Sequence, residues 1–271
     1  MGELQKILRV SIFLADTPIP KVFEKFGGYD EQISKLLQDT INSKKLKLSL
    51  IIKNYDVKNM EFPEEDDLSK MDGIIITGSA SSAYDDIPWI NRLADFTKLI
   101  IDKHQHIKLI GICFGHQIIA RAAGGQIIKN PLGWEIGVTE VSLTDVGSNF
   151  FKIDNKVLRI QEMHQDHVKI LPKGFCNLGF TSKSSIQGMI KGNQVLTVQG
   201  HPEFVGESTK IIINARLNKG IFTQEFAQTG LKAADYEDDH VIIGLKFIEF
   251  MMGYYHKSPY TRPGPLTFHQ F

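Results

Sequence analysis

The chain has 271 residues, enough for one large domain or two small ones. Its 31 Lys and Arg residues balance 31 Asp and Glu residues, so no global basic field exists to hold nucleic acid or an anionic membrane. Two cysteines are too few for a disulfide scaffold or a Cys-rich zinc module. The sequence has no run of 18 apolar residues and no signal-peptide cleavage pattern, which predicts a soluble, cytoplasmic protein.

The first half of the chain alternates short apolar runs with helical patterns. The runs predict strands at residues 9–14, 46–52, 73–77 and 108–113. Helices are expected from about residue 28, over residues 89–102, and from residue 117 to the Gly-Gly pair at 124–125, while the acidic stretch 61–67 is expected to be a solvated loop. Continuous apolar strands separated by helices indicate a parallel sheet covered by helices on both faces.

The second half of the chain has a different pattern. Shorter strands separated by turn residues are predicted at 137–143, 158–163, 177–181 and 186–191, and they favour an antiparallel extension of the sheet. A buried strand at 195–199 and helices at 207–219 and 239–252 follow, and the proline-containing residues 257–271 are expected to be a tail. The predicted fold class is therefore α/β, with a flavodoxin-like, mainly parallel mixed sheet.

The clearest chemical signal is a cysteine between a predicted strand and a predicted helix. Residues 111–117 read Gly-Ile-Cys-Phe-Gly-His-Gln, and the small residues around Cys113 permit the sharp turn that exposes a nucleophile at the carboxyl edge of a sheet. The N-terminus of the following helix favours an ionised sulfur, and the N–H of Phe114 could stabilise an oxyanion. No comparable context surrounds Cys176, which is expected to be structural.

A second signal, His201-Pro202-Glu203, directly follows another buried strand. A cysteine nucleophile needs a base, and the base needs an acid that orients it. His201 can face the same sheet edge as Cys113, and Glu203 can bind the far nitrogen of its ring. The chain order nucleophile, His, acid differs from that of α/β-hydrolases, in which the acid precedes the His.

Taken together, these two segments resemble the class I glutamine amidotransferase domain. The resemblance extends to the glycine loop Thr77-Gly78-Ser79, to residues 134–137 (Trp-Glu-Ile-Gly) and to residues 163–167 (Met-His-Gln-Asp-His). It implies one glutamine amidotransferase-like domain over residues 1–256, followed by the tail at 257–271. The glycine loop departs from the Gly-Gly-Pro sequence that biosynthetic members often have.

The resemblance implies cysteine-dependent hydrolysis of a γ-glutamyl amide through a thioester. Cys113 would be the nucleophile, His201 the base and proton donor, and Glu203 the residue that orients His201. The N–H groups of Gly78 and Phe114 would form the oxyanion hole.

Substrate contacts follow from the resemblance in the same way. Gln117, and the backbone near Glu135 and Gln165, would hold the α-amino and α-carboxylate groups of the γ-glutamyl substrate. Tyr84 and Trp89 could line the pocket rim or pack in the core. No cofactor or metal ion is implied.

Three functions stay open on this sequence. The chain could be a glutaminase, a γ-glutamyl peptidase acting on glutathione or its conjugates, or a non-catalytic binding or regulatory module with the same fold. It contains no synthetase region or phosphate-binding loop, and any synthetase partner cannot be identified. We expect a self-sufficient enzyme whose oxyanion donors are in place without a partner.

Overall fold

The computed structural model describes residues 6–254. The expected tail at residues 257–271 lies outside the described residues. Within the described range the strands are β1 (Lys6–Phe13), β2 (Leu48–Tyr55), β3 (Gly73–Ile76), β4 (Lys108–Ile112), β5 (Gln126–Lys129), β6 (Glu135–Leu143), β7 (Val157–His164), β8 (Asp166–Ile170), β9 (Cys176–Phe180), β10 (Gly188–Lys191) and β11 (Val195–Val198). The helices are α1 (Pro20–Phe26), α2 (Tyr29–Ser43), the 3-10 helix η1 (Val57–Asn59), α3 (Glu65–Leu68), α4 (Pro88–Lys103), α5 (Phe114–Ala122), α6 (Asp145–Phe151), α7 (Gly206–Asn218), α8 (Gln224–Ala233) and α9 (His240–Met251).

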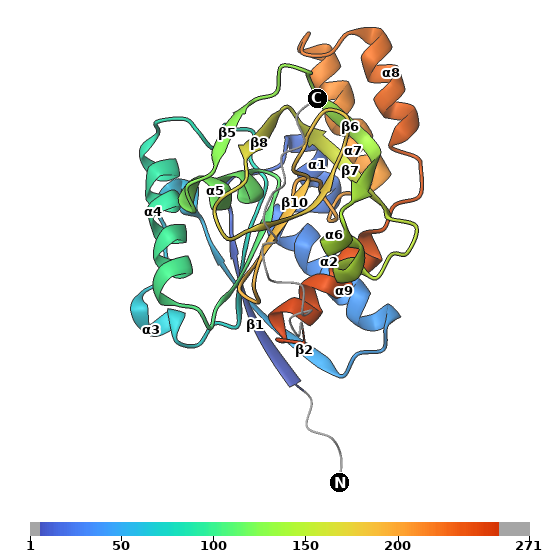
Figure 1. The fold of residues 1–271 in the computed structure, drawn as a ribbon. Helices are drawn as coiled ribbons and strands as arrows, with labels where there is room; N and C mark the ends of the chain where they lie inside the picture. Colours follow the sequence, from blue (N-terminus) through green and yellow to red (C-terminus); the bar gives the residue numbers. More distant parts are fainter. Residues whose placement is uncertain (1–5, 255–271) are drawn as a thin grey trace, which may run out of the picture.

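A mixed sheet forms the centre of the molecule (Figure 1). Within the described residues its order is β2-β1-β3-β4-β11-β10-β9-β6-β7, and β5 and β8 pair separately. Strands β2, β1, β3, β4 and β11 run parallel, whereas the pairs from β11 through β10, β9, β6 and β7 are antiparallel. The predicted α/β class, with a mainly parallel sheet and an antiparallel extension, is confirmed.

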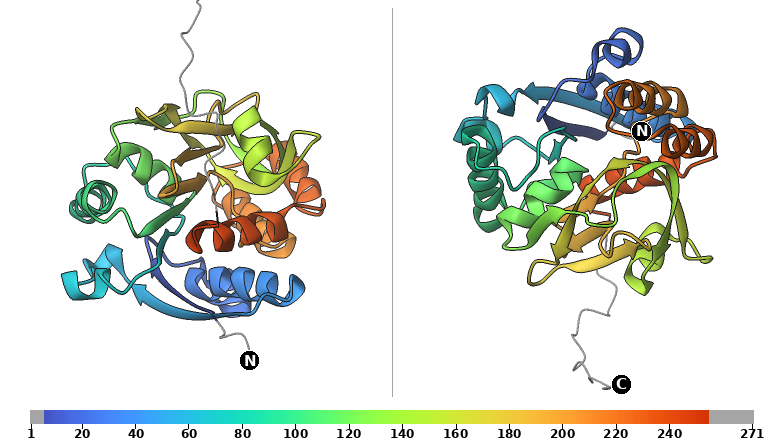
Figure 2. Two further views of the ribbon diagram at one scale, coloured as in Figure 1. Left: turned by 60° about the horizontal axis from the view of Figure 1, so that its bottom comes forward. Right: turned by 90° about the horizontal axis from the view of Figure 1, so that it is seen from above.

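Both faces of the sheet are buried. In β3, Ile74 and Ile76 pack with α4 and α5, while Ile75 between them packs with α2 and α9 on the opposite face. Figures 1 and 2 show α4 on one side of the sheet, and α2 with α9 on the other. The continuous apolar sequence of this strand is therefore explained by burial on two faces.

A third apolar cluster covers part of the sheet's carboxyl end. It joins α1, α7 and α8 to β6 and β7, with Val22, Ile136, Phe204, Ile213 and Phe222 among its buried members. These helices stand together at the top of Figure 1. This helical cap forms one wall of the candidate site described below.

Several elements differ from the sequence-based expectations. Helices α1, α6 and α8 and strands β5 and β8 were not predicted, and the short helix Glu65–Leu68 overlaps the stretch 61–67 that was expected to be a loop. Short elements bury few side chains, so their sequences carry weak periodicity. The N-caps Thr144 and Thr223, which accept hydrogen bonds from the N–H groups of Gly147 and Phe226, are the local signals for α6 and α8.

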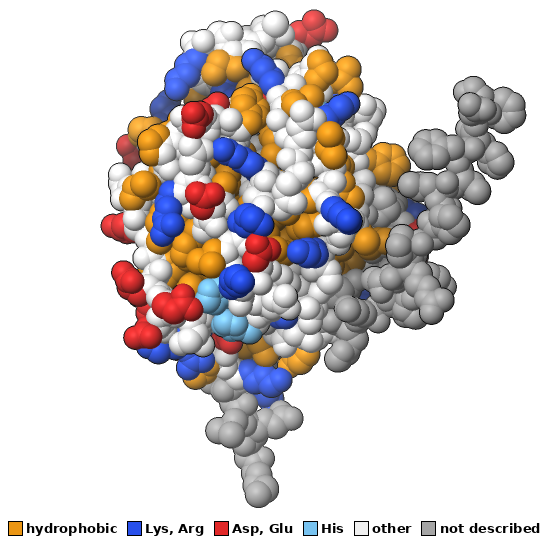
Figure 3. All heavy atoms as spheres, turned by 60° about the vertical axis from the view of Figure 1, so that its left-hand side comes forward, with side chains coloured by type: hydrophobic (Ala, Val, Ile, Leu, Met, Phe, Trp, Pro, Cys, Tyr) orange, Lys and Arg blue, Asp and Glu red, His pale blue; other side chains and the backbone are white. Residues whose placement is uncertain are grey.

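None of the helices in residues 6–254 combines the length and apolar character needed to cross a membrane. Acidic and basic side chains are interspersed on the face shown in Figure 3. On α4, for example, Lys98 pairs with Asp102 at 2.8 Å. The neutral net charge is therefore accompanied by mixed signs on this face.

Candidate active site

Cys113 occupies a strained turn between β4 and α5. Its φ of 52° and ψ of −103° lie in a region that costs a non-glycine residue about 1–3 kcal/mol. Close packing enforces the turn, since a Cβ on Gly111 would lie 2.5 Å from the carbonyl oxygen of Gly115, and a Cβ on Gly115 would lie 2.2 Å from that of Ile76. The predicted elbow is thus present, with the buried cysteine at the N-cap of α5.

His201 and Glu203 follow β11, which lies next to β4 in the sheet. The Nδ1 atom of His201 is 2.8 Å from Oε1 of Glu203, and both side chains are buried. The ring of Phe204 stacks on the imidazole, with 4.1 Å between centroids and 8° between planes. One carboxylate and one aromatic ring therefore fix the orientation of the imidazole.

The environment of His201 favours its protonated form. Burial of the ring opposes protonation, but the carboxylate of Glu203 and the sulfur of Cys113 outweigh it and raise the pKa of His201 well above its usual value. Cys113 also lies near Gly78, because a Cβ on Gly78 would be 2.7 Å from Cε1 of His201 and 3.7 Å from Cβ of Cys113. The structure therefore brings the predicted cysteine, histidine, glutamate and glycine together at one sheet edge.

The loop after β3 offers free backbone donors beside the sulfur. No hydrogen bond among the described residues uses the N–H of Gly78, Ser79 or Phe114. The carbonyl oxygen of Thr77 accepts from the N–H of Gly115 at 3.1 Å, and that of Gly78 accepts from the hydroxyl of Thr77 at 3.1 Å. Ser79, unlike Gly78, lines the cavity next to Cys113.

Asp16, which follows β1, anchors the same loop. Its Oδ2 atom accepts from the N–H of Ala80 at 2.9 Å and from the hydroxyl of Ser79 at 3.3 Å. Its Oδ1 atom pairs with Lys58 at 2.7 Å and accepts from the N–H of Thr17. Sequence analysis did not identify this residue, because nothing near it in the chain marks it as part of the site.

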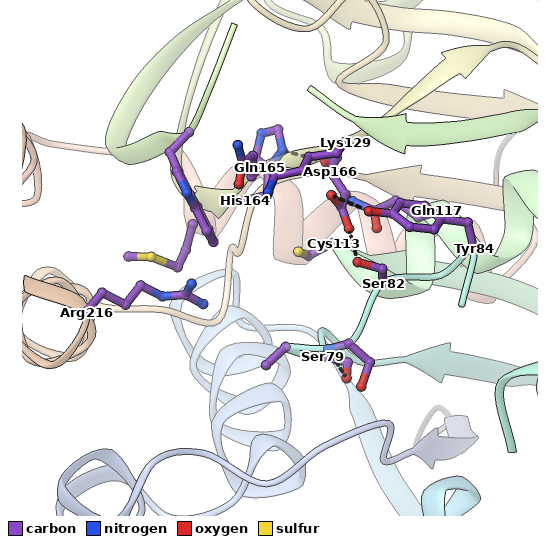
Figure 4. Close-up of a pocket in the computed structure, with 14 residues that line it drawn as sticks. Ser79, Ser82, Tyr84, Cys113, Gln117, Lys129, His164, Gln165, Asp166 and Arg216 are labelled. Carbon is purple, nitrogen blue, oxygen red and sulfur yellow. Dashed lines mark hydrogen bonds between the residues drawn. The ribbon is translucent and has the colours of Figure 1, made fainter. Parts of the chain in front are cut away.

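Two cavities meet at Cys113. The first, of about 220 Å³, is polar and is shown in Figure 4, where Arg216 and the pair Ser82–Asp166 lie on opposite sides of the sulfur. Asp166 accepts hydrogen bonds from Ser82 Oγ at 2.5 Å and from the Tyr84 hydroxyl at 3.3 Å. A carboxylate is thus held at the wall of this cavity, and a cation, Lys129, also lines it.

The predicted substrate contacts are only partly gathered here. Gln117 and Gln165 line the first cavity, and the Nε2 atom of Gln117 donates to the carbonyl of Asp166 at 2.9 Å. Tyr84 lines it as well, whereas Trp89 is buried against Phe114 with ring centroids 5.5 Å apart.

The carboxylate of Glu135 is outside the cavity lining. It lies 3.2 Å from Nε2 of His164 and accepts hydrogen bonds from Thr181 and Gln187. These partners outweigh the effect of burial and lower the pKa of Glu135 to about 2. The preceding residue, Trp134, lines the cavity.

A buried carboxyl group that sequence analysis missed lies behind the site. Both carboxyl oxygens of Glu162 lack a hydrogen-bond partner among the described residues, and one is 3.4 Å from Nε2 of His164. Burial, with the negative charge of Glu135, raises the pKa of Glu162 well above its usual value. A Cβ on Gly200 would lie 2.8 Å from this carboxyl group, which therefore packs directly under the turn that carries His201.

The second cavity, of about 300 Å³, opens on the other side of Cys113. Its walls are mainly apolar and come from the helical cap and the segment before it, with Ile19, Val22, Phe204, Ile212 and Ile221 among the lining residues. Apart from Cys113 and His201, the charged residues that line it are Asp16, Arg216 and Lys219. Throughout the described residues, no group of three or more His, Cys, Asp or Glu side chains could hold a metal ion.

Comparison with known proteins identifies the family. The family model for class-I glutamine amidotransferases matches residues 29–218, a span that contains Cys113, His201 and Glu203. The chain therefore belongs to the class-I glutamine amidotransferase family.

Relatives and solved structures extend this assignment. The chain is 38% identical to a glutamine amidotransferase-like protein of Schizosaccharomyces pombe over 90% of this chain and 98% of that protein. It is 35% identical to gamma-glutamyl peptidase 4 of Arabidopsis thaliana over 84% of this chain and 88% of that protein. A glutamine amidotransferase of Thermotoga maritima has the same fold, with a TM-score of 0.67, 21% identity, and coverage of 90% of this chain and 97% of that one.

Proposed function

We propose that this protein hydrolyses γ-glutamyl amides through a thioester on Cys113. The observation that carries the proposal is the strained cysteine elbow beside the buried His201–Glu203 pair. A strained nucleophile, a base and an orienting acid at one sheet edge are what covalent acyl transfer requires.

In the first half-reaction, Sγ of Cys113 attacks the γ-carbonyl carbon of the substrate. The carbon–nitrogen bond then breaks, and His201 gives its proton to the departing amine. Glu203 stabilises the protonated ring and keeps its other nitrogen directed at the reacting atoms. The product of this step is a γ-glutamyl thioester on Cys113.

In the second half-reaction, water attacks the thioester carbon. His201 takes a proton from the water as its oxygen attacks. The carbon–sulfur bond then breaks and the γ-glutamyl acid leaves. This step restores the starting pair, the ionised sulfur of Cys113 beside protonated His201. The oxyanion that forms in each half-reaction would be held by the N–H of Phe114 and by an N–H of the Gly78–Ser79 loop. The absence of competing bonds to these N–H groups within the described residues supports this role.

The first cavity suits the γ-glutamyl group because that group is a zwitterion. The Asp166 carboxylate can bind its α-ammonium, and Lys129 and the Gln165 segment can bind its α-carboxylate. Gln117 would then act by holding the backbone at Asp166 in place. In this proposal Gln117 and Gln165 belong to the site, and the carboxylate of Glu135 supports it from outside the cavity lining.

A second candidate differs only in the leaving group. Ammonia needs almost no space, yet a cavity of about 300 Å³ lies on the other side of Cys113. This observation favours γ-glutamyl peptides as substrates over glutamine, and relatives named gamma-glutamyl peptidases are consistent with that choice.

We also infer that no synthetase partner is needed to form the oxyanion loop, residues 77–80 after β3. The loop is held by Asp16 and Thr77 of the same chain, and Ser79 of the loop lines the same cavity as Cys113. A partner would therefore find the loop already arranged.

The test is hydrolysis of γ-glutamyl-leucine and of glutamine by the purified chain. Cys113→Ala should lower turnover by at least about 10³-fold, because covalent catalysis is lost while binding survives. Cys176→Ala is the matched control, since Cys176 lies in β9, and it should behave as wild type. A glutamine-like electrophile should label Cys113 once. Wild-type turnover in Cys113→Ala would refute the mechanism.

A further inference from the structure

Arg216 stands at the junction of the two cavities. It extends from α7 toward Cys113 and lines both spaces (Figure 4). Its guanidinium carbon lies 4.4 Å from the centre of the Trp134 ring, which fixes the plane of the group. The proposed mechanism assigns Arg216 no task.

This guanidinium has no anionic partner in the part of the chain that the structure describes. It forms neither a salt bridge nor a hydrogen bond there, although it is half-buried, and burial lowers the pKa of Arg216. A desolvated cation is costly unless an anion joins it, so the position favours an anionic ligand.

The other charged residues of the second cavity also favour an anionic ligand. Asp16 is already engaged by Lys58 and by the backbone N–H groups of Thr17 and Ala80. Lys219, the C-cap of α7, is exposed, lines the same cavity as Arg216, and has no acidic partner among the described residues. The second cavity thus has an apolar body, formed in part by Ile212 and Phe204, and an unbalanced positive end.

We propose that Arg216 binds a carboxylate on the leaving group. This inference rests on the proposed γ-glutamyl hydrolysis, and it narrows the substrates to γ-glutamyl amino acids or short peptides with an apolar side chain and a free carboxylate. The apolar side chain would lie against Ile212 and Phe204, and the carboxylate would meet the planar guanidinium in a bidentate contact.

The γ-glutamyl group itself does not need Arg216. The first cavity already presents Asp166 and Lys129 to its ammonium and carboxylate groups. Because Arg216 borders both cavities, an experiment must separate the two roles.

Two substrates of equal shape make that separation. γ-Glutamyl-leucine carries a carboxylate on the leaving group, and γ-glutamyl-leucinamide carries a neutral amide in its place. Wild type should show a kcat/KM at least about 10-fold higher for the acid, the factor typical of a charge-assisted hydrogen bond. Arg216→Gln should remove most of that preference, chiefly through KM, because it should lower kcat/KM for the acid much more than for the amide.

Matched variants control for charge and folding. Lys210→Gln removes one positive charge from the same helix, but Lys210 pairs with Asp235 and lines neither cavity, so it should keep the wild-type preference. Arg216→Lys should restore part of the preference, because it keeps the charge and loses the planar fork. Thermal unfolding of each variant reports whether it is folded.

Three results would overturn the inference: equal kcat/KM for the two substrates in wild type, equal loss on both in Arg216→Gln, or loss of the preference in Lys210→Gln. Calorimetry of both compounds binding to Cys113→Ala tests the carboxylate site without turnover. It therefore separates a failure of this inference from a failure of the proposed reaction. If wild type hydrolyses neither compound, the reaction is wrong, and tighter binding of the acid that depends on Arg216 would still support the carboxylate site. Equal binding would refute it.

Discussion

Replacing Asp16 with alanine should slow turnover although Asp16 touches no reacting atom. The carboxylate holds the proposed oxyanion loop after β3 through the N–H of Ala80 at 2.9 Å and the hydroxyl of Ser79 at 3.3 Å. Its side chain is 15% exposed, so water can replace these bonds only in part. Asp16 is therefore a positioning residue for the loop beside Cys113.

The size of the effect follows from these contacts. A hydrogen bond to a charged group contributes about 1.5–3 kcal/mol to stability, and Asp16→Ala removes two that hold the loop. A donor that moves by about 1 Å can cost about 10²-fold in rate. We expect kcat to fall about 30- to 100-fold, which lies at or below the lower end of the about 10²- to 10³-fold loss that removal of one oxyanion donor produces, while KM changes little.

The assay is steady-state hydrolysis of γ-glutamyl-leucine, with alkylation of Cys113 as a measure of an intact nucleophile. Lys58→Ala is the matched control, because it removes the 2.7 Å ion pair to Asp16 and leaves both bonds to the loop. Lys58 is 46% exposed, so its pair contributes about 1 kcal/mol or less, and kcat should stay within about threefold of wild type. Equal losses in the two variants, or an unchanged kcat in Asp16→Ala, would refute the anchoring role.

Three further predictions concern titration and packing. Glu203→Gln should lower kcat less than Cys113→Ala does. It should also move the alkaline limb of the pH profile of kcat/KM to lower pH, because the charge of Glu203 raises the pKa of His201. An alkaline limb that does not move would contradict this. Gly115→Ala should cost about 3 kcal/mol or more in the free energy of unfolding, since its Cβ would lie 2.2 Å from a buried carbonyl oxygen, and denaturant titration showing a loss below about 1 kcal/mol would contradict it. Glu162 has a raised pKa in the folded protein, so its contribution to stability falls as pH rises above its ordinary pKa of 4.5. Glu162→Gln should therefore raise Tm at pH 8 and change it less at pH 4.5. The reverse order would refute the raised pKa of Glu162.

The residues that sequence analysis identified best are those with a local signature. Cys113 lies between an apolar run and a helical pattern, and His201 and Glu203 directly follow another apolar run, so each could be placed at the end of a strand. Parallel neighbours then bring those strand ends to one edge, as the pairing of β4 with β11 confirms.

Residues whose position depends on packing between distant segments could not be found in this way. Asp16 reaches the loop at residues 79–80 only because β1 pairs with β3, and no local pattern reports that pairing. Arg216 occupies an ordinary helical sequence, and it reaches the site only because α7 packs over β6 and β7. For Glu135 the prediction concerned the backbone near it, and the structure adds that its carboxylate lies against His164.

The order of strands explains how the residues at the sheet edge and those of the helical cap can vary separately. The neighbours β1, β3, β4 and β11 carry, in that order, the anchor Asp16, the oxyanion loop, Cys113 and His201 at their carboxyl ends. Neighbouring strands lie about 4.8 Å apart, so the sheet itself sets the spacing of these groups. The helical cap does not belong to the sheet, and α7 with its C-cap contributes Arg216 and Lys219 to the second cavity without contributing to the elbow at Cys113. For the proposed reaction, substitutions on α7 can therefore change which leaving group is accepted while Cys113, His201 and the loop after β3 stay in place.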